Sequence, residues 1–482
     1  MKLFSLLKNI HCRVVGNSVI EIKGLYHKDT EVKENGLFFC LRGTRVDGIE
    51  FVSSAIKNGA VAIVVEQEIQ SLHKITQVVV KDAREAMSLI ACRFYGNPAS
   101  KLKILGVTGT NGKTTITNML SSVLNCAGLK TALIGTNGVV LNNMVIDSGM
   151  TTPDPIELQS YLALMVRQKV DYVCMEVSAH AIDLKKVCGI HFEGVIFTNL
   201  TEDHLDYFKT MQNYYVAKSR LFSKRYTDLA IVNLDDEYGD RLSKSINIDL
   251  KTYAINNNDA DFVAKNTARN SNVQTFSVDD REYKINLAGK FNVSNALSAI
   301  ALLKTIGIDE CVIEKGLKNL ERVEGRFNAV GIGEKLVVVD YAHTPDGLKN
   351  VLIACKEIAN ENNAKVLLVF GCGGNRDAQK RPIMGEIAST LAAFSIVTTD
   401  NPRFESREEI ALDIEKGMLN ENHIIELDRA LAIKKAIDMA SVGDVVLIAG
   451  KGAETYIDEN GTKMPFSDFD EVEKYRRQCG IL

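Results

Sequence analysis

The sequence lacks an apolar run long enough to cross a membrane. Runs such as residues 61–65 and 445–449 are of strand length, whereas a membrane helix needs about 20 apolar residues. The N-terminal segment has too short an apolar core for a signal peptide, and it has no small-residue cleavage site. We therefore expect no membrane insertion.

The chain also lacks a strong excess of either charge. Its 57 Lys and Arg residues nearly balance its 61 Asp and Glu residues, and the formal net charge is −4. Binding to a polyanion depends on clustered positive charge, so we expect no nucleic-acid partner.

No two of the ten cysteines form a CxxC pair, and most stand in apolar surroundings, as Cys174 does. Scattered thiols of this kind disfavour a disulfide or zinc framework and are typical of a reducing compartment. We therefore expect a cytoplasmic protein. The sequence also has no internal repeat and no low-complexity segment.

A chain of 482 residues exceeds the usual size of one hydrophobic core, which predicts two to four domains, most simply three. Short β-rich runs alternate with amphipathic stretches, as in an α/β fold with largely parallel sheets. We place a small mixed α/β domain at residues 1–97, a central domain at 98–325 and a C-terminal domain at 326–482. Asn97 precedes a proline and is therefore disfavoured in a helix, which marks the first boundary.

Ligands bind at the carboxyl ends of strands in open α/β sheets, so the strand ends locate the candidate sites. We expect strands at residues 36–41, 60–65, 104–107, 170–177, 194–198, 229–233, 335–340, 365–370, 394–399 and 444–449. We expect helices at residues 51–58, 113–127 and 293–306.

The segment from Gly106 to Thr115 follows a β-rich run and opens a helix. Glycines let the backbone wrap around a phosphate, and the N-terminus of a helix supplies oriented N–H donors. Lys113 can reach the β- and γ-phosphates, and the Thr114 hydroxyl can bind Mg²⁺. Val107 stands where the general pattern has its first glycine. We still predict an ATP or GTP site rather than a glycine-rich turn with a chance lysine. The expected contacts are Gly109, Thr110, Asn111, Gly112, Lys113, Thr114 and Thr115.

Residues 108–114, with the sequence TGTNGKT, resemble the nucleotide loop of the Mur ligases and of the related folylpolyglutamate synthases. The resemblance covers nearly the whole chain, with several motifs in order. It implies a UDP-binding N-terminal domain, a central ATPase domain with a parallel sheet and a C-terminal Rossmann-like domain. It also implies an ATP-dependent ligase that makes an amide bond through an acyl phosphate. Such ligases serve peptidoglycan synthesis, and through it cell shape and division.

Two further strand ends carry groups suited to this chemistry, Glu176 and His204. A nucleotide and a substrate carboxylate repel each other, and divalent cations relieve that repulsion. Either residue alone is equally well explained as a surface or capping group, but the two together beside a phosphate loop favour metal binding, with Glu176 as a Mg²⁺ ligand. The resemblance implies that His204 serves a second metal ion. The resemblance further implies that Lys218 becomes carbamylated and serves as a metal ligand. It places Asn292 or Asn295 beside the nucleotide, together with Arg326 and Asp340.

The resemblance also indicates a UDP-muramyl dipeptide as the substrate. Thr151, Thr152, Ser178 and Lys186 match positions that contact this substrate, although many relatives have arginine in place of Lys186. In the N-terminal domain, the expected contacts to the nucleotide sugar are Thr30, Thr44 and Arg45. Glu31 replaces an arginine found in relatives.

The segment Asp400-Asn401-Pro402-Arg403 follows a predicted strand and is expected to select the amino acid that is added. Meso-diaminopimelate carries one more amino-carboxylate end than a simple amino acid. Arg403 offers a two-pronged donor for a carboxylate, and Asp400 and Asn401 offer acceptors for an ammonium. Alone, this segment would be explained as a proline turn with a surface arginine. The remaining expected contacts are Arg376, Gly450 and Glu454.

Three alternatives remain open. The acceptor could be L-lysine. A folylpolyglutamate- or cyanophycin-type ligase would share the ATP chemistry but would not need Arg403. A nucleotide-binding switch would keep the phosphate loop but leave Glu176, His204 and Lys218 without a role. We expect a monomer.

Overall fold

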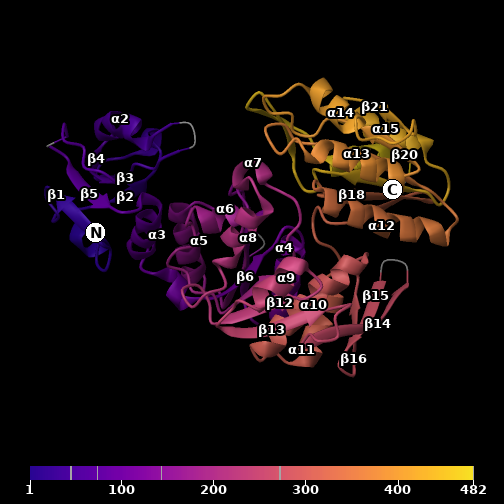
Figure 1. Ribbon diagram of the computed structural model, residues 1–482, viewed down its shortest axis with the longest axis horizontal. Coiled ribbons are helices and arrows are strands. Elements are labelled where there is room, and N and C mark those ends of the chain that lie inside the picture. The colour runs from indigo at the N-terminus through magenta and orange to yellow at the C-terminus, as the bar shows by residue number, and fades with distance from the viewer. Residues whose placement is uncertain (44–45, 73, 143, 271–272, 481–482) are drawn as a thin grey trace.

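Three main β-sheets, each built from its own stretch of the chain, organise the protein (Figure 1). The computed structural model describes residues 1–43, 46–72, 74–142, 144–270 and 273–480. The first sheet lies in the indigo part of the ribbon, the second in the magenta part and the third in the orange to yellow part. In the described residues, no helix is both long and apolar enough to span a bilayer.

The N-terminal sheet has the strand order β1-β5-β4-β3-β2. Only β1 is antiparallel to its neighbour. Its strands are β1 (Cys12–Val15), β2 (Gly24–Tyr26), β3 (Gly36–Phe39), β4 (Ala60–Val65) and β5 (Thr76–Val80). Its helices are α1 (Leu3–Leu6), α2 (Val52–Lys57) and α3 (Ala83–Phe94).

The central sheet has eleven strands in the order β16-β15-β14-β13-β12-β11-β6-β10-β7-β8-β9. Its strands are β6 (Lys103–Thr108), β7 (Thr131–Gly135), β8 (Gly138–Leu141), β9 (Met144–Ile146), β10 (Tyr172–Glu176), β11 (Gly194–Phe197), β12 (Leu229–Asn233), β13 (Asp249–Ala254), β14 (Phe262–Asn270), β15 (Val273–Val278) and β16 (Arg281–Ile285). Its helices are α4 (Lys113–Cys126), α5 (Pro155–Arg167), α6 (Ala179–Asp183), α7 (Leu205–Phe208), α8 (Met211–Ser219), α9 (Glu237–Ser243), α10 (Lys290–Thr305) and α11 (Glu310–Asn319). The adjacent strands β14-β13-β12-β11-β6-β10-β7 run parallel, and antiparallel strands extend the sheet at both ends.

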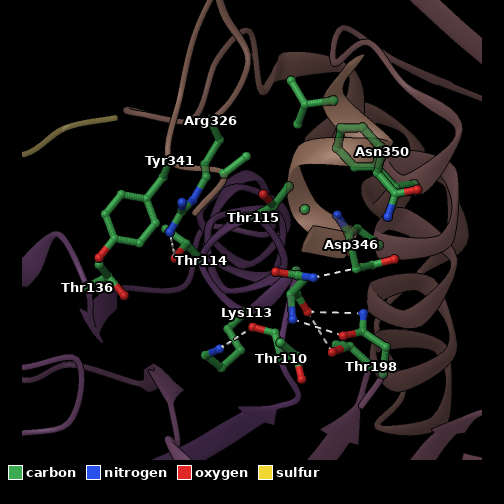
Figure 2. A pocket seen from close by; sticks show the side chains of 18 of the residues that line it. Thr110, Lys113, Thr114, Thr115, Thr136, Thr198, Arg326, Tyr341, Asp346 and Asn350 are labelled. Carbon is green, nitrogen blue, oxygen red and sulfur yellow. Dashed lines mark hydrogen bonds between the residues drawn. The ribbon is translucent and has the colours of Figure 1, made fainter. Parts of the chain in front are cut away.

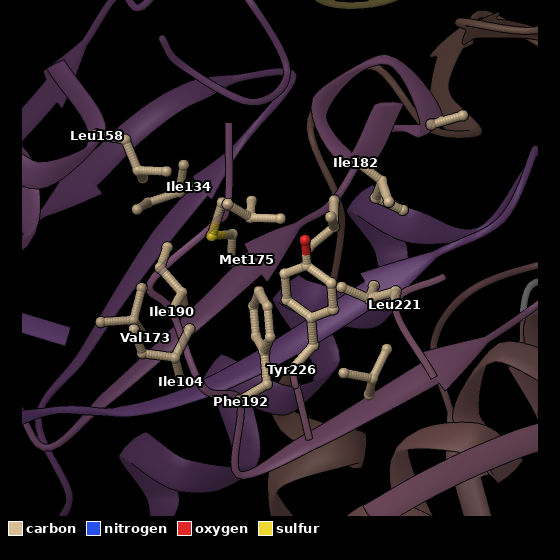
Figure 3. Packing of buried hydrophobic residues seen from close by; sticks show 14 of the residues in the cluster. Ile104, Ile134, Leu158, Val173, Met175, Ile182, Ile190, Phe192, Leu221 and Tyr226 are labelled. Atoms are coloured by element: carbon tan, nitrogen blue, oxygen red, sulfur yellow. The ribbon is translucent and has the colours of Figure 1, made fainter. Parts of the chain in front are cut away.

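Two apolar cores cover the two faces of the central sheet, because alternate residues of a buried strand face opposite sides. In β6, Ile104 belongs to one core and Leu105 to the other. Figure 3 shows the first core, where Phe192 and Tyr226 pack among aliphatic side chains. A Cβ added at Gly106 would lie 2.9 Å from the Phe192 ring, so this strand needs glycine there.

The C-terminal sheet has the order β17-β18-β22-β19-β20-β21, and only β17 is antiparallel to its neighbour. Its strands are β17 (Asn328–Ile332), β18 (Lys335–Asp340), β19 (Val366–Phe370), β20 (Phe394–Val397), β21 (His423–Ile425) and β22 (Val445–Ala449). A separate hairpin joins β23 (Tyr456–Glu459) to β24 (Thr462–Pro465). The helices are α12 (Pro345–Glu361), α13 (Lys380–Leu391), α14 (Arg407–Glu415), α15 (Arg429–Met439) and α16 (Asp468–Gln478).

The expected α/β class is confirmed, and each expected strand is present with ends shifted by no more than a few residues. Two differences stand out. Helix α10 begins at Lys290, three residues before the expected start, because Gly289 adopts a positive φ of 94° at its N-cap. The antiparallel strands at both ends of the central sheet were not expected from the sequence.

Candidate functional site

A cavity of about 260 Å³ lies between the central and C-terminal sheets (Figure 2). The loop between β6 and α4 forms one wall, and residues that follow β18 form the other. Both walls come from the carboxyl ends of parallel strands, which is the usual place for a ligand in such sheets.

The phosphate loop is held in shape by the strand beside it. Asn111 N donates to Asn199 Oδ1 over 2.9 Å, and Thr198 Oγ1 donates to Asn111 O over 2.7 Å. Gly109 has a φ of 149°, and a Cβ there would lie 1.8 Å from Thr198 Oγ1. Because α4 starts at Lys113, its free N–H groups point into the same space, as anion binding requires.

Lys113 and Arg326 bring positive charge to the cavity from opposite walls. Lys113 Nζ donates to Gly109 O at 2.9 Å and to Thr110 O at 2.8 Å, so its ammonium folds back over the loop. Burial lowers the pKa of Lys113, although the charges of Glu176 and Asp203 oppose the shift. The guanidinium of Arg326 lies 4.3 Å from the centre of the Tyr341 ring (Figure 2).

Three other expected nucleotide contacts also line this cavity. Asn295 lies close over the loop, since a Cβ at Gly112 would be 2.5 Å from its Oδ1. Asp340 accepts from Phe327 N and Ala342 N, each at 2.7 Å, so one oxygen holds the segment before β17 and the other holds the turn after β18. Thr115 lies in the first turn of α4.

Glu176 is a buried carboxylate at the end of β10, with 1% of its surface exposed. Its Oε1 accepts from Thr114 Oγ1 and from Thr136 N, both at 2.9 Å. The Thr114 hydroxyl and this carboxylate together present hard oxygen ligands to the cavity, which suits Mg²⁺.

His204 and Asp203 lie at the far side of the same cavity. His204 Nε2 is 3.3 Å from Asp203 Oδ2, and its ring is 4.8 Å from that of His180. Burial lowers the pKa of His204 to about 3, although Asp203 opposes the shift. The imidazole is therefore neutral, which is the form that binds a metal ion.

Lys218 is 1% exposed and does not line the cavity, but it contacts the phosphate loop from behind. Its Nζ donates to Gly109 O at 2.9 Å and lies 4.7 Å from the centre of the Tyr214 ring. Burial, and then the charge of Lys113, lower the pKa of Lys218 well below its ordinary value. A neutral amine is the form that reacts with CO₂. As an amine this residue does not fit a metal site, whereas its carbamate would.

In the described residues, no three His, Cys, Asp or Glu side chains group in a way that could hold a metal. A cation beside Glu176 would therefore need other oxygens, from Thr114, from bound phosphates or from a carbamate at Lys218. This sparse set fits Mg²⁺, which keeps several waters and takes few ligands from the protein.

Residues expected to contact the muramyl dipeptide fall into two groups. Thr151 and Ser178 line the cavity, and Thr151 Oγ1 is 3.2 Å from Thr136 Oγ1. Thr152 and Lys186 are not part of the cavity lining but contact residues near it. Thr152 Oγ1 donates to Glu176 O at 3.0 Å, and Lys186 Nζ pairs with Asp154 at 2.8 Å. Outside the cavity, Thr30 is exposed on a short turn of the N-terminal domain. Thr44 and Arg45 lie outside the described residues.

The expected acceptor residues gather at the carboxyl ends of β20 and β22, except Arg376, which follows β19. Asn401 Nδ2 donates to Glu454 Oε2 at 2.8 Å, and Gly450 N donates to Asp340 O at 3.0 Å. Arg403 Nη1 donates to Gly374 O at 2.7 Å. Asp400 is buried beside Asn401, whereas Arg376 is exposed. Pro402 continues the same turn, and its carbonyl accepts from Glu405 N at 3.0 Å.

Sequence reasoning named no role for several residues that line the cavity. Asp346 accepts from Asn111 Nδ2 at 2.9 Å and so joins the two walls (Figure 2). Burial, followed by the charge of Lys380, lowers the pKa of His343. Asp346 and His343 lie in the segment that begins with Asp340 at the end of β18, so the position of that segment at a strand end could have identified them. Tyr341 lines the cavity and lies against the loop of the acceptor residues, because a Cβ added at Gly452 would be 2.8 Å from the Tyr341 Cβ. Burial, followed by the charge of Glu454, raises its pKa.

Comparisons with known proteins agree along most of the chain. Residues 107–303 match the Mur ligase middle domain, residues 325–452 the Mur ligase glutamate ligase domain, and residues 21–95 the Mur ligase family catalytic domain. UDP-N-acetylmuramoyl-L-alanyl-D-glutamate--2,6-diaminopimelate ligase 1 of Clostridium acetobutylicum is 44% identical over 466 residues, covering 95% of both chains. The ligase of the same name, without the number, from Clostridium tetani is 42% identical and also covers 95% of both chains. A solved structure of a UDP-N-acetylmuramoyl-L-alanyl-D-glutamate--2,6-diaminopimelate ligase has a TM-score of 0.69 and 30% identity, and covers 98% of this chain and 99% of its own.

Proposed function

This chain belongs to the Mur ligase family of ATP-dependent, ADP-forming ligases, and from that premise we propose its substrates. It adds meso-diaminopimelate to the D-glutamate carboxylate of UDP-N-acetylmuramoyl-L-alanyl-D-glutamate, a step of peptidoglycan synthesis. The relatives named above carry this activity in their names. The observation that carries the proposal is one cavity that joins a phosphate loop to Thr151 and Ser178, with the loop of the acceptor residues packed against Tyr341.

In the first step, the D-glutamate carboxylate attacks the γ-phosphorus of ATP, and ADP leaves. Lys113 and Arg326 approach the phosphates from opposite walls and stabilise the negative charge that is transferred. The N–H groups at the start of α4 hold the phosphates in place. The product of this step is an acyl phosphate.

In the second step, an amine of the acceptor attacks the carbonyl carbon of the acyl phosphate. A tetrahedral intermediate collapses, phosphate leaves and the amide bond is formed. Because the nucleotide wall and the acceptor loops lie on different sheets, their relative position decides how well the reacting atoms meet. Movement of the C-terminal domain is therefore expected to complete the site.

The proposed ligands of two Mg²⁺ ions are Thr114, Glu176, His204 and Lys218, the last as N6-carboxylysine, with His204 at the second ion. When bound, the cations would neutralise charge between ATP and the substrate carboxylate. Support comes from the oxygen pair of Thr114 and Glu176 and from the low pKa of the buried Lys218 amine.

The three domains divide the substrates between them in this proposal. Residues 1–97 bind the UDP-sugar through Thr30, Thr44 and Arg45. Residues 98–325 bind ATP and the dipeptide, and residues 326–482 bind the amino acid. The three sheets support this division, since each lies within one range. We further propose that the protein is cytoplasmic, because ATP and UDP-linked precursors are found there, and that it is a monomer.

For the acceptor, we propose that Arg376 and Arg403 hold the distal carboxylate of meso-diaminopimelate. Asp400, Asn401, Pro402, Gly450 and Glu454 complete its pocket. L-Lysine has no distal carboxylate and would leave these arginines without a partner, which is the basis of the selectivity.

The test is release of phosphate from ATP by the purified protein with the UDP-muramyl dipeptide. Meso-diaminopimelate, L-lysine and L-ornithine are compared as acceptors. We expect turnover with diaminopimelate and an increase in its KM in Arg403→Ala. Arg407→Ala is a matched control, since this residue lies four positions on and pairs with Glu459.

Turnover with lysine alone would keep the ligase but reject the proposed acceptor. Failure of every acceptor with folded, ATP-binding protein would reject the muramyl substrate. A folylpolyglutamate-type activity would then be tested with a folate and glutamate.

A further inference from the structure

Lys451 is a wholly buried lysine in the loop after β22, with 0% of its surface exposed. Its Nζ donates to Asn401 Oδ1 at 3.1 Å and to Glu454 Oε2 at 3.0 Å. It thus joins the loops that follow β20 and β22, the two that carry the proposed acceptor residues. A buried charge is costly unless it is paired and hydrogen-bonded, so this arrangement constrains both loops.

These contacts fix which atoms of Asn401 and Glu454 remain for a ligand. Asn401 Oδ1 accepts from Lys451 and also from Asp458 N at 2.9 Å, so its oxygen is fully used. Asn401 Nδ2 faces a carboxylate, Glu454 Oε2, and this settles the orientation of the amide. Asn401 can therefore offer a ligand only an N–H donor and not the acceptor expected from the sequence.

Glu454 has one oxygen committed and one available. Oε2 takes both Lys451 and Asn401, whereas Oε1 has no hydrogen bond from any of the described residues. The Glu454 side chain is partly exposed, so this oxygen is accessible to a ligand. An ammonium group of the acceptor is the partner that a free carboxylate oxygen would take.

Lys451 also balances the charge of Asp400. Burial alone would raise the pKa of Asp400, but Lys451 and then Arg429 outweigh it, and the pKa lies below its ordinary value. Arg429 is held in turn by Asp468 and donates to Thr399 O and Ala449 O, at the roots of the same two loops. Lys451 is therefore the cation in contact with both Asn401 and Glu454, and Arg429 supports the strand ends behind it.

We infer that Lys451 is a positioning residue that sets the specificity of the acceptor site. It holds Glu454 so that one oxygen takes an ammonium, and it occupies the Asn401 oxygen so that the amide offers the acceptor only an N–H, which suits a carboxylate. Its charge lowers the negative potential of a site that contains Asp400 and Glu454. That favours an acceptor whose far end carries both an ammonium and a carboxylate over one that carries an ammonium alone. This inference rests on the proposed acceptor site.

The test replaces Lys451 with methionine, which keeps the length of the side chain and removes the charge. We expect the KM for meso-diaminopimelate to rise by about 10- to 100-fold, the loss typical of one charge-assisted hydrogen bond. The kcat and the KM for ATP are expected to stay near wild-type values. The ratio of kcat/KM for diaminopimelate over that for L-lysine is expected to fall, because without the charge of Lys451 the carboxylates of Asp400 and Glu454 repel the distal carboxylate of diaminopimelate, which lysine lacks.

Lys335→Met is the matched control, because Lys335 Nζ donates to Ile437 O at 2.9 Å and begins β18 at the opposite end of the sheet. Lys451→Gln is the second variant, since its amide can still donate but carries no charge. It is expected to keep the fold, as judged by thermal unfolding, and still to lose preference for diaminopimelate. Unchanged preference in folded Lys451→Gln would overturn the role of the charge.

A double-mutant cycle with Glu454→Gln tests whether Lys451 acts through that carboxylate. We expect the effect of Lys451→Met on the KM of the acceptor to be much smaller in the Glu454→Gln background. Additive effects would overturn the inference while leaving the proposed function intact. The proposed function itself is tested by the acceptor preference of the wild-type protein, so the two failures can be told apart.

Discussion

Arg326 Nη2 donates to the Thr114 hydroxyl over 3.0 Å, which joins the start of the C-terminal domain to the first turn of α4. The same hydroxyl donates to Glu176 at 2.9 Å. These two hydrogen bonds thus link Arg326, just before β17, through Thr114 to Glu176, a proposed metal ligand. The position of the C-terminal domain is therefore coupled to the geometry of the nucleotide site.

We expect Arg326→Ala to lower kcat/KM for ATP by about 10- to 100-fold, because a charge-assisted contact to the phosphates is lost. Arg326→Lys is expected to recover only part of this, since lysine cannot offer a planar fork or stack on Tyr341 in the same way. Steady-state kinetics with ATP varied measures both effects. Arg322→Ala is the control, because Arg322 is exposed and lies four residues away. Equal losses in the two variants would contradict the assignment.

Local features of the site were predictable from the sequence. The phosphate loop was recognisable because its glycines, its lysine and its position between a strand and a helix lie within ten consecutive residues. The sequence placed Glu176 and His204 at strand ends because each stands at or after the end of a buried run, and both residues line the cavity.

Features that depend on packing between distant segments were not predictable. A lysine in a glycine-rich loop looks exposed in the sequence, and only the fold buries Lys451 against Asn401. Asp346 meets Asn111 across 235 positions of the chain. The antiparallel strands at the ends of the central sheet were also missed, because short alternating runs do not reveal which neighbour they pair with.

Carbamylation of Lys218 should make activity depend on CO₂. The buried amine has a lowered pKa and is therefore reactive when neutral. We expect activity to fall in protein freed of CO₂ at mildly acidic pH and to recover on addition of bicarbonate. Lys218→Ala should lose about 10- to 100-fold in activity or in apparent affinity for Mg²⁺, as changes around metal ligands do.

The exposed Lys224, changed to alanine, serves as the control for Lys218→Ala. Mass spectrometry of the native protein should find one added CO₂ in wild type and none in Lys218→Ala. Full activity of Lys218→Ala would rule the modification out as a requirement.

The contact between the N-terminal and central domains should weaken at low pH. Lys185 pairs with Asp82 and Glu85, and Arg225 pairs with Glu85 at 2.6 Å. Burial raises the pKa of both carboxyls, but hydrogen bonds from these cations outweigh it, so both pKa values lie below normal. A lowered pKa in the folded state means that the stabilisation is present above the ordinary carboxyl pKa and is lost as the pH falls through the folded value.

These side chains are about one-third exposed, so each pair contributes only about 0.2–1 kcal/mol. We expect the unfolding temperature to decrease as the pH is lowered past about 4. The decrease should be less steep in the double variant Asp82→Asn/Glu85→Gln. Glu68→Gln removes a surface pair within the N-terminal domain and is the control. An identical pH profile in the double variant and the wild type would contradict this role for the ion pairs.

Gly109 should tolerate no side chain, because two separate constraints act on it. Its φ of 149° is unfavourable for other residues, and a Cβ would lie 1.8 Å from Thr198 Oγ1, a side chain that itself holds the loop through Asn111 O. We expect Gly109→Ala to displace the loop and to weaken ADP binding by at least about tenfold, which calorimetry would measure, and to cost about 1–3 kcal/mol of stability.

Gly128→Ala separates backbone strain from steric collision, since Gly128 has a φ of 77° with nothing within 4 Å of a Cβ. That control should lose only about 1 kcal/mol and should bind ADP normally. If both variants bound ADP as the wild type does, the close approach of Gly109 to Thr198 would have no part in shaping the phosphate site.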